Sequence, residues 1–173
     1  MPTSVTVIIA PFHAGAYCER VGKGPHRIAE TGLIDALYSA GVQDIDFVEL
    51  DRVDDFEGEI GRSFEVKRRI AIAVNEAVAG NRFPLVLAGN CNATVGVYAG
   101  LGQDCDVVWF DAHPDFNTPD EVTGGYFDGM GVATLAGTAG KDLRVASPDL
   151  DLSPSANSSI VAFGTSRVVS AKR

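Results

Sequence analysis

Short apolar runs recur along the chain and alternate with amphipathic stretches. A continuous apolar run of this kind is typical of a strand buried on both faces of a parallel sheet. The predicted strands are residues 4–10, 45–50, 83–88, 107–110 and 159–163. The stretches between them have apolar residues at helical spacing, and the predicted helices are residues 25–40, 63–78, 93–101 and 129–136. This alternation predicts a three-layer α/β/α fold with a mainly parallel sheet and right-handed crossovers.

Several residues predict where helices begin and end. Pro25 suits a helix start, where its missing N–H is not needed, and Gly41 suits a helix end. Ser63 is the predicted N-cap of the next helix. Apolar residues at every fourth position give that helix a core-facing row, which consists of Val66, Ile70, Val74 and Val78.

Three potential metal ligands follow the apolar run at residues 107–110. They are Asp111, His113 and Asp115, at alternate positions. In open α/β sheets, ligands bind beyond the carboxyl ends of strands, where these side chains would lie. Carboxylates can bridge two divalent ions and imidazole adds a nitrogen ligand, so the set predicts a metal site that makes hydroxide from water. The alternative is that both acids are turn residues around Pro114 and that His113 caps a helix.

Composition narrows the class of protein. The chain has 173 residues, of which 46% are hydrophobic and 21% are charged, and this suits a single domain over residues 1–173. Residues 137–158 are rich in Gly, Ser, Pro and Asp, and we expect them to form a flexible loop. The net charge of −9 argues against nucleic acid or an anionic membrane surface as a partner. The three cysteines have no framework spacing and the start has no signal-peptide pattern, so we expect a reducing cytoplasm. No apolar run approaches the roughly 18 residues that a membrane span needs.

Five segments of the chain carry a resemblance to a known family. They are Val-Gly-Lys-Gly-Pro at residues 21–25, the strand and turn at residues 83–92, Asp-Ala-His-Pro-Asp-Phe-Asn-Thr-Pro at residues 111–119, Gly-Gly-Tyr-Phe-Asp-Gly-Met at residues 124–130, and the strand ending in Gly-Thr-Ser-Arg at residues 160–167. In their order and spacing they resemble the ureohydrolases, which include arginase, agmatinase and formimidoylglutamase. The resemblance implies an arginase-like fold, incomplete because the family's downstream Asp-x-Asp metal motif does not follow.

The resemblance also implies a reaction. Ureohydrolases cleave a guanidino or amidino C–N bond with a metal-bound hydroxide at a paired manganese (Mn2+) centre. By this resemblance Asp111 would bridge both ions, Asp115 would bind one and His113 the other, while Asn117 would contact the substrate. Asp111, Asp115 and Asp128 are the candidate catalytic residues, and Asp128 stands where arginases have a proton-moving histidine. The implied partners are a small guanidino or amidino compound and further copies of the chain in a homo-oligomer.

Two positions leave alternatives open. Cys91 stands at the family's first metal histidine, where its thiolate would favour Zn2+ or Fe2+; the alternative is a buried structural cysteine. Asp149 and Asp151 resemble the missing downstream metal motif, although acids in such a loop are commonly solvated turn residues. Two functions follow. One is a metal-dependent hydrolase, and the other is a catalytically impaired remnant of the family that acts as a binding or assembly partner.

Overall fold

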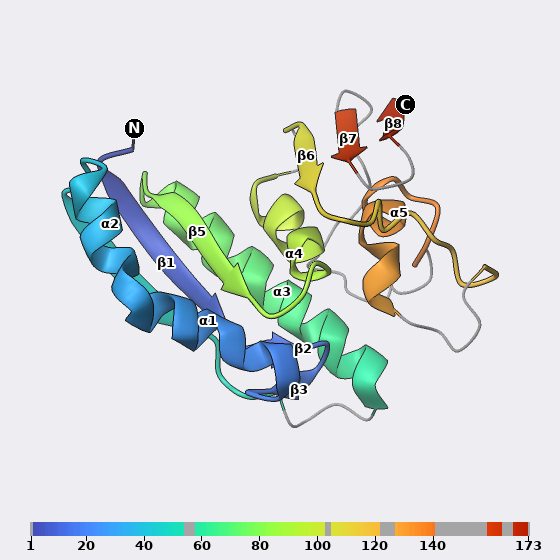
Figure 1. Cartoon of the computed structure of the whole chain (residues 1–173), viewed down its shortest axis with the longest axis horizontal. Coiled ribbons are helices and arrows are strands. Elements are labelled where there is room, and N and C mark those ends of the chain that lie inside the picture. The colour runs from blue at the N-terminus through green and yellow to red at the C-terminus, as the bar shows by residue number, and fades with distance from the viewer. Residues whose placement is uncertain are drawn as a thin grey trace.

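Two three-stranded β-sheets contain the apolar strands (Figure 1). The computed structural model describes residues 2–53, 58–102, 105–121, 127–140, 159–163 and 168–172. In the first sheet, β1 (Ser4–Ala10) is parallel to both β4 (Asp44–Glu49) and β5 (Phe83–Ala88). In the second, β6 (Val107–Phe110) is parallel to β7 (Ser159–Phe163), which is antiparallel to β8 (Val168–Lys172). The predicted α/β class with mainly parallel strands is confirmed.

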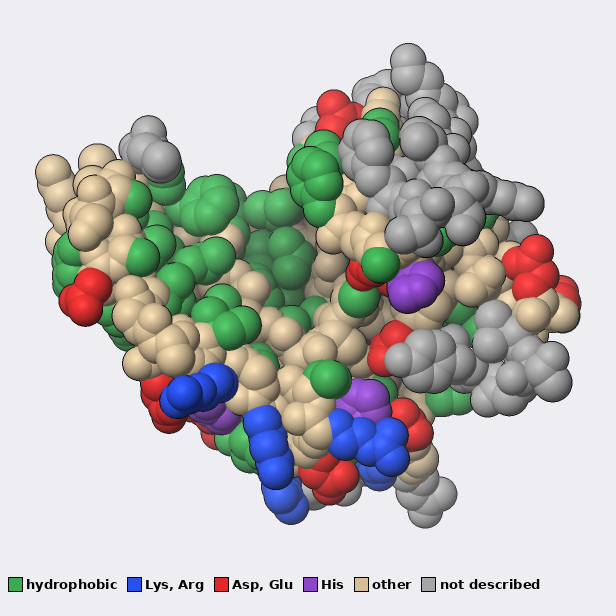
Figure 2. Space-filling model, viewed as in Figure 1, with side chains coloured by type: hydrophobic (Ala, Val, Ile, Leu, Met, Phe, Trp, Pro, Cys, Tyr) green, Lys and Arg blue, Asp and Glu red, His purple; other side chains and the backbone are tan. Residues whose placement is uncertain are grey.

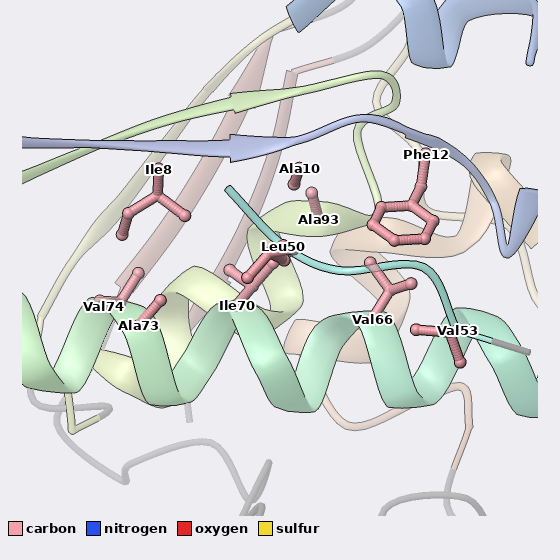
Figure 3. Close-up of a cluster of buried hydrophobic side chains, with 10 residues drawn as sticks. All are labelled: Ile8, Ala10, Phe12, Leu50, Val53, Val66, Ile70, Ala73, Val74 and Ala93. Atoms are coloured by element: carbon pink, nitrogen blue, oxygen red, sulfur yellow. The ribbon is translucent and has the colours of Figure 1, made fainter. Parts of the chain in front are cut away.

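Helices cover both faces of the first sheet because the side chains of β1 alternate between the faces. Val5, Val7 and Ile9 face the layer of α1 (Gly24–Ile28), a π-helical turn (Ala29–Leu33) and α2 (Ile34–Ser39). Ile8 and Ala10 face α3 (Gly58–Ala79). Figure 3 shows this second cluster, which includes Val66, Ile70, Ala73 and Val74 of α3. Among the described helices, none has both the length and the apolarity to cross a membrane.

A compact connection links β1 to α1. It contains a small antiparallel hairpin of β2 (Phe12–His13) and β3 (Ala16–Tyr17), followed by a 3-10 turn (Arg20–Lys23). The rings of Phe12 and Tyr17 meet edge to face, with centroids 5.3 Å apart. The connection therefore has its own packing at the carboxyl end of β1.

Two glycines let α4 (Ala93–Gly100) lie directly on α3. A Cβ atom at Gly96 would lie 2.5 Å from the carbonyl oxygen of Lys67, and one at Gly100 would lie 2.5 Å from that of Ala71. No larger residue fits at such a distance. Beyond α4, a further hydrophobic cluster, separate from the two on the first sheet, joins β6 to α5 (Gly131–Leu135). It includes Val95, Tyr98, Trp109, Val132 and Leu135.

Three local features correct the sequence prediction. The helix predicted at residues 25–40 is interrupted, because Thr31 and Gly32 have non-helical backbone angles. Ser63 is not an N-cap, since α3 already includes Gly58 and Ser63 lies buried inside the helix. Val78, in the last turn of α3, is 45% exposed, whereas the other three members of the predicted row are buried.

Strand β6 is open to solvent on one face. Val108 is 57% exposed and Phe110 is 83% exposed, whereas Trp109 between them is 6% exposed. The prediction that residues 107–110 form a strand buried on both faces is therefore wrong for this chain. The reason is that Trp109 packs into the core with α4 and α5, while the opposite face is left open by the described elements.

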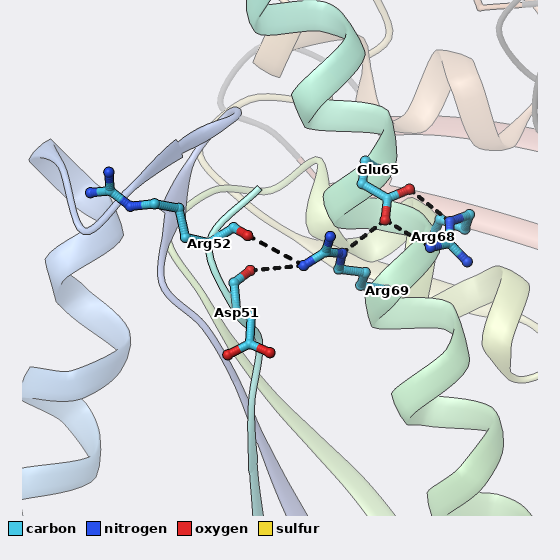
Figure 4. A network of polar contacts seen from close by, with 5 residues as sticks. All are labelled: Asp51, Arg52, Glu65, Arg68 and Arg69. Carbon is cyan, nitrogen blue, oxygen red and sulfur yellow. Dashed lines mark hydrogen bonds and ion pairs between the residues drawn. The ribbon is translucent and has the colours of Figure 1, made fainter. Parts of the chain in front are cut away.

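A buried carboxylate on α3 is fully paired with arginines (Figure 4). Glu65 accepts hydrogen bonds from Nε and Nη2 of Arg68, both at 2.7 Å, and from Nε of Arg69 at 2.8 Å. Arg69 also donates to the backbone carbonyls of Asp51 and Arg52. The bonds from Arg68 and then Arg69 hold the pKa of Glu65 below its usual value, despite burial. The network ties α3 to the segment after β4.

Candidate metal centre

The carboxyl ends of β5 and β6 bring three potential metal ligands together. Cys91 lies in the turn between β5 and α4, and Asp111 and Asp115 follow β6. Their ligand atoms all lie within 4.8 Å of one another. The Cys91 thiol donates a hydrogen bond to Oδ2 of Asp111 over 3.1 Å. We call these three residues the cysteine–aspartate cluster.

The backbone of Asp115 fixes its side chain in the cluster. Its φ of +44° lies in the left-handed region, which is uncommon for a residue other than glycine. Its carbonyl oxygen accepts hydrogen bonds from the N–H groups of Val132 (3.0 Å) and Ala133 (3.2 Å) in the first turn of α5. These N–H groups have no partner within the helix, so the bonds satisfy them and offset the backbone strain. The side chain is 8% exposed.

Burial and mutual proximity shift the pKa values of the cluster. The His113 backbone N–H, 3.0 Å from Oδ1, lowers the pKa of Asp111, which is therefore ionised near neutral pH. Burial, followed by the charge of Asp111, raises the pKa of Asp115 to about 6. Burial and the hydrogen bond to Asp111 raise the pKa of the Cys91 thiol to about 12. A bound cation would favour the ionised form of each group, so metal binding would release the thiol proton.

His113 and Asn117 lie outside the cluster. The His113 side chain is 77% exposed, and its Nδ1 is 3.7 Å from Oδ1 of Asp111. The ring would have to turn inward to join the three clustered ligands. Asn117 is exposed, and its backbone N–H donates to the Gly129 carbonyl over 3.1 Å, which ties the loop after β6 to the turn before α5.

Asp128 approaches the cluster from a 3-10 turn (Phe127–Met130) before α5. Its Oδ1 accepts a hydrogen bond from Nδ2 of Asn90 over 2.7 Å. Nδ2 of Asn92 donates to the Phe127 carbonyl over 2.6 Å and holds the turn in place. The charge of Asp128 contributes to the raised pKa of Asp115. Sequence reasoning missed both asparagines, and the only signal was their position immediately after an apolar strand.

A buried lysine beside this turn was also missed. Lys67 is 1% exposed, and its Nζ donates to Oγ of Ser63 over 2.9 Å. The ammonium lies 4.6 Å from the ring centre of Phe64 and 4.5 Å from that of Phe127. Burial lowers the pKa of Lys67 to about 7, against the opposing effect of Asp128. The available signal was spacing, because Phe64, Lys67 and Ala71 lie on one helical stripe.

The donor set fits a divalent metal ion. Carboxylates suit Mn2+, whereas the softer sulfur of Cys91 favours Zn2+ or Fe2+. Three clustered donors, joined by His113 after rotation, suffice for one ion; a pair of ions needs further negative charge and further donors. Asp149 and Asp151, which resemble the family's downstream metal motif but could equally be solvated turn residues, lie outside the described residues, as do residues 141–158 of the predicted flexible loop.

Fold and cluster together define an α/β protein with potential metal ligands at the carboxyl ends of its strands. The Arginase family model matches residues 3–169. The chain is 29% identical to the arginase of Bacillus subtilis (strain 168) over 152 residues, which are 83% of this chain and 51% of that protein. It is 32% identical to the mitochondrial arginase-2 of Homo sapiens over 143 residues, which are 76% of this chain and 40% of that protein. The chain belongs to the arginase family.

Solved structures agree with this assignment. A crystal structure of arginase from Bacillus subtilis superposes with a TM-score of 0.70 and 26% identity, covering 91% of this chain and 55% of that one. The arginase of Entamoeba histolytica, solved in complex with L-ornithine, has a TM-score of 0.71 at 22% identity and supports the fold alone. The arginase-like fold is therefore confirmed. The chain spans about half the length of the curated relatives it matches.

Proposed function

We propose that this chain contributes the cysteine–aspartate cluster to a metal-dependent hydrolase of the ureohydrolase class. The observation that carries the proposal is the convergence of Cys91, Asp111 and Asp115 at the carboxyl ends of two strands, the usual ligand-binding edge of such sheets. Membership of the arginase family supports a hydrolase acting on a small guanidino or amidino compound.

The metal would be held by Asp111, Asp115 and Cys91, with His113 turning inward. When bound, such an ion lowers the pKa of water and stabilises negative charge on oxygen. Asp111 is already ionised, because the His113 backbone N–H lowers its pKa, so it is the natural first ligand. The backbone carbonyl of Asp115 is bonded to the first turn of α5, which positions its side chain beside the other ligands. The chain's residues thus hold the donors in place before the ion arrives.

The acids around the cluster would also select a cationic substrate. A guanidinium group is planar and donates pairs of hydrogen bonds to carboxylates. Asp128, held by Asn90, would accept such bonds, and the exposed Asn117 would contact the other end of the substrate. Hydrolysis adds water across the C–N bond, and the departing nitrogen takes up a proton. Asp128 would accept a proton from the attacking water and pass it to the departing nitrogen, in place of the histidine expected from the family resemblance.

A second candidate function is a catalytically impaired family member that acts as a binding or assembly partner. It is favoured by the number of donors, because the cluster among the described residues has three, fewer than two dications require. Under this alternative the acids would hold one ion weakly. A homo-oligomer and a cytoplasmic location are compatible with either function and are part of the same proposal.

Metal titration distinguishes the two functions. The full chain is titrated calorimetrically with Mn2+ or Zn2+, and its metal content is measured after gel filtration. The test variant is Asp111→Asn with Asp115→Asn, and the matched control is Asp120→Asn, an exposed acid in the same loop. A hydrolase binds about two ions per chain and releases urea or ammonia from a guanidino compound, and only the test variant loses both. Less than one ion, lost on mild chelation and without product release, identifies the impaired member. No binding of either ion would refute the metal site.

A further inference from the structure

Three separate elements place a cysteine, a histidine and a glutamate in a row, away from the cysteine–aspartate cluster. Cys18 directly follows β3, His26 lies in α1, and Glu49 is the last residue of β4. Figure 2 shows charged and histidine side chains gathered along the lower edge of the molecule, where Figure 1 places β2, β3 and α1. Cys18 is half-buried, and the side chains of His26 and Glu49 are 34% and 45% exposed. We call these three residues the Cys18–His26–Glu49 cluster.

Hydrogen bonds to Glu49 fix the orientation of the imidazole. Nε2 of His26 is 2.9 Å from Oε1 of Glu49, and Tyr17 donates its hydroxyl proton to the same oxygen over 2.9 Å. Burial alone would raise the pKa of Glu49, but the bonds from His26 and then Tyr17 outweigh it and hold this pKa below its usual value. Glu49 is therefore ionised near neutral pH and can only accept, so Nε2 carries the ring proton and Nδ1 keeps its lone pair. Nδ1 lies 4.0 Å from Sγ of Cys18, a distance that a hydrogen bond to sulfur allows, and it can accept the thiol proton.

The order of these groups is that of an activated nucleophile. A thiol becomes a strong nucleophile when an adjacent base takes its proton, and a third group that orients the base completes the arrangement. His26 is the base, and the Glu49 carboxylate holds the ring and stabilises the imidazolium that forms. Contacts between a nucleophile and its base are often long before the reactant binds and shorten during the reaction. The backbone of Cys18 is unusual as well, because its φ of +54° lies in the left-handed region.

The backbone N–H of Cys18 distinguishes between two kinds of reaction. Acyl transfer requires N–H donors for the developing oxyanion, and the N–H of the nucleophile itself is commonly one of them. The Cys18 N–H instead donates to the Pro11 carbonyl over 2.7 Å, so it is engaged within the loop. A peroxide makes no such demand, because its leaving group is hydroxide, which needs a single proton, and His26 can return that proton. A small peroxide can also reach a half-buried thiol.

We propose that Cys18 is a site of oxidation by small peroxides, with His26 as general base and then general acid and Glu49 as the residue that positions it. The Cys18 proton moves to Nδ1 of His26, and the sulfur attacks one oxygen of the peroxide as the O–O bond breaks. The departing hydroxide takes the proton from His26 and leaves as water. The sulfur loses two electrons and becomes a sulfenic acid, while the peroxide is reduced. The Cys18–His26–Glu49 cluster shares no residue with the metal site, so the inference holds under either proposed function.

Oxidation resolved by residue tests the inference. The full chain is reduced, transferred to metal-free buffer and exposed to hydrogen peroxide in the presence of dimedone, which traps sulfenic acid. Peptide mass spectrometry then follows each cysteine separately. Cys105, which is also half-buried, is the reference within the same chain. Cys18 should be labelled at least about tenfold faster than Cys105 in the folded protein, because only Cys18 is served by the His26 base. In concentrated urea, where the cluster is lost, the two rates should become similar.

Variants separate the action of His26 from simple exposure of the thiol. His26→Gln should lower the rate of Cys18 oxidation by about tenfold or more, and Glu49→Gln should lower it less, because the ring then lacks only its orienting carboxylate. Arg27→Gln, at the exposed neighbour in α1, is the control and should leave the rate unchanged. Alkylation of Cys18 by iodoacetamide, whose leaving iodide needs no proton, should fall less than oxidation in His26→Gln. Circular dichroism checks folding, and the comparison within the unmodified chain stands alone if a variant unfolds.

Four results would overturn the inference. Two concern the unmodified chain: equal labelling of Cys18 and Cys105 when it is folded, and a difference between them that persists in urea. Two concern folded His26→Gln: a rate of Cys18 oxidation as high as that of the parent, and an equal loss of oxidation and alkylation, which would refute the return of the proton by His26. Metal content and hydrolysis are not readouts of this experiment. Failure of the metal site would therefore leave the inference standing, and failure of the inference would leave the metal site untouched.

Discussion

Replacing Lys67 with methionine should stabilise the protein and remove part of its pH dependence. The lysine is 1% exposed, and burial lowers its pKa from 10.5 to about 7. In the unfolded chain the amine has its ordinary pKa, so between pH 7 and 10.5 the unfolded state binds a proton that the folded state does not. The free energy of unfolding must therefore rise with pH in this window, by about 1.4 kcal/mol per pH unit at most. Methionine has a similar length, carries no charge and can stay beneath the rings of Phe64 and Phe127.

Urea denaturation at several pH values measures this effect. Fluorescence of the single tryptophan, Trp109, reports unfolding, since it is buried in the core beside α5. At pH 7.5 we expect Lys67→Met to be more stable by roughly 1–4 kcal/mol, the range seen when buried charges are replaced by apolar groups. By pH 9.5 the difference should shrink by about 2–3 kcal/mol. Lys23→Met, at an exposed lysine, serves as the control and should show no such change. A difference that stays constant with pH would refute the reasoning, because it would mean that Lys67 is charged in the folded protein.

Three further changes test other parts of the structure. Glu65→Gln should destabilise the protein by about 1–3 kcal/mol at pH 7 in urea denaturation. Because the arginine bonds lower the pKa of Glu65, its contribution to stability is present at neutral pH and is lost as the pH falls below 4.5. Equal acid sensitivity of the variant and the parent would contradict this stabilising role of the Glu65 carboxylate. Gly96→Ala should lower the thermal midpoint and reduce the free energy of unfolding by about 1–3 kcal/mol. The control is Gly24→Ala, where a Cβ atom meets nothing within 4 Å, and it should be close to neutral. Equal effects of the two changes would argue against close packing of α4 on α3. Asp149→Ala combined with Asp151→Ala should lower the metal content if these residues are ligands, and unchanged content would remove them from the site.

The strands could be predicted because four of them are short runs of mainly apolar residues and the fifth, β4, alternates apolar with acidic residues. The predicted ranges for β1, β5, β6 and β7 are the observed ones, and β4 is displaced by one residue. Helix boundaries were less predictable. Ser63 has the chemistry of an N-cap, but its hydroxyl accepts a hydrogen bond from a lysine one turn later inside α3. Tertiary packing decided that position, and local propensity did not.

The site could be predicted only in part, because its residues come from separate segments. Asp111 and Asp115 are close in sequence and follow a recognisable strand, whereas Cys91 was placed beside them only by family resemblance. Burial of Lys67 was missed because lysine is rarely fully buried. The exposure of Val108 was missed for a different reason: an apolar strand sequence shows that the strand is suited to burial, not which of its faces other elements cover.

Anomalous X-ray scattering shows directly whether Cys91, Asp111 and Asp115 hold a metal ion. Crystals of the full chain are soaked in Mn2+ or Zn2+, and anomalous difference maps are calculated at the absorption edge of each metal. We expect a peak at about 2.0–2.2 Å from an oxygen of both carboxylates and, for Zn2+, at about 2.3 Å from the Cys91 sulfur. A map with no peak among these three side chains at saturating metal, or with its only strong peak elsewhere on the molecule, would refute a metal site at these residues.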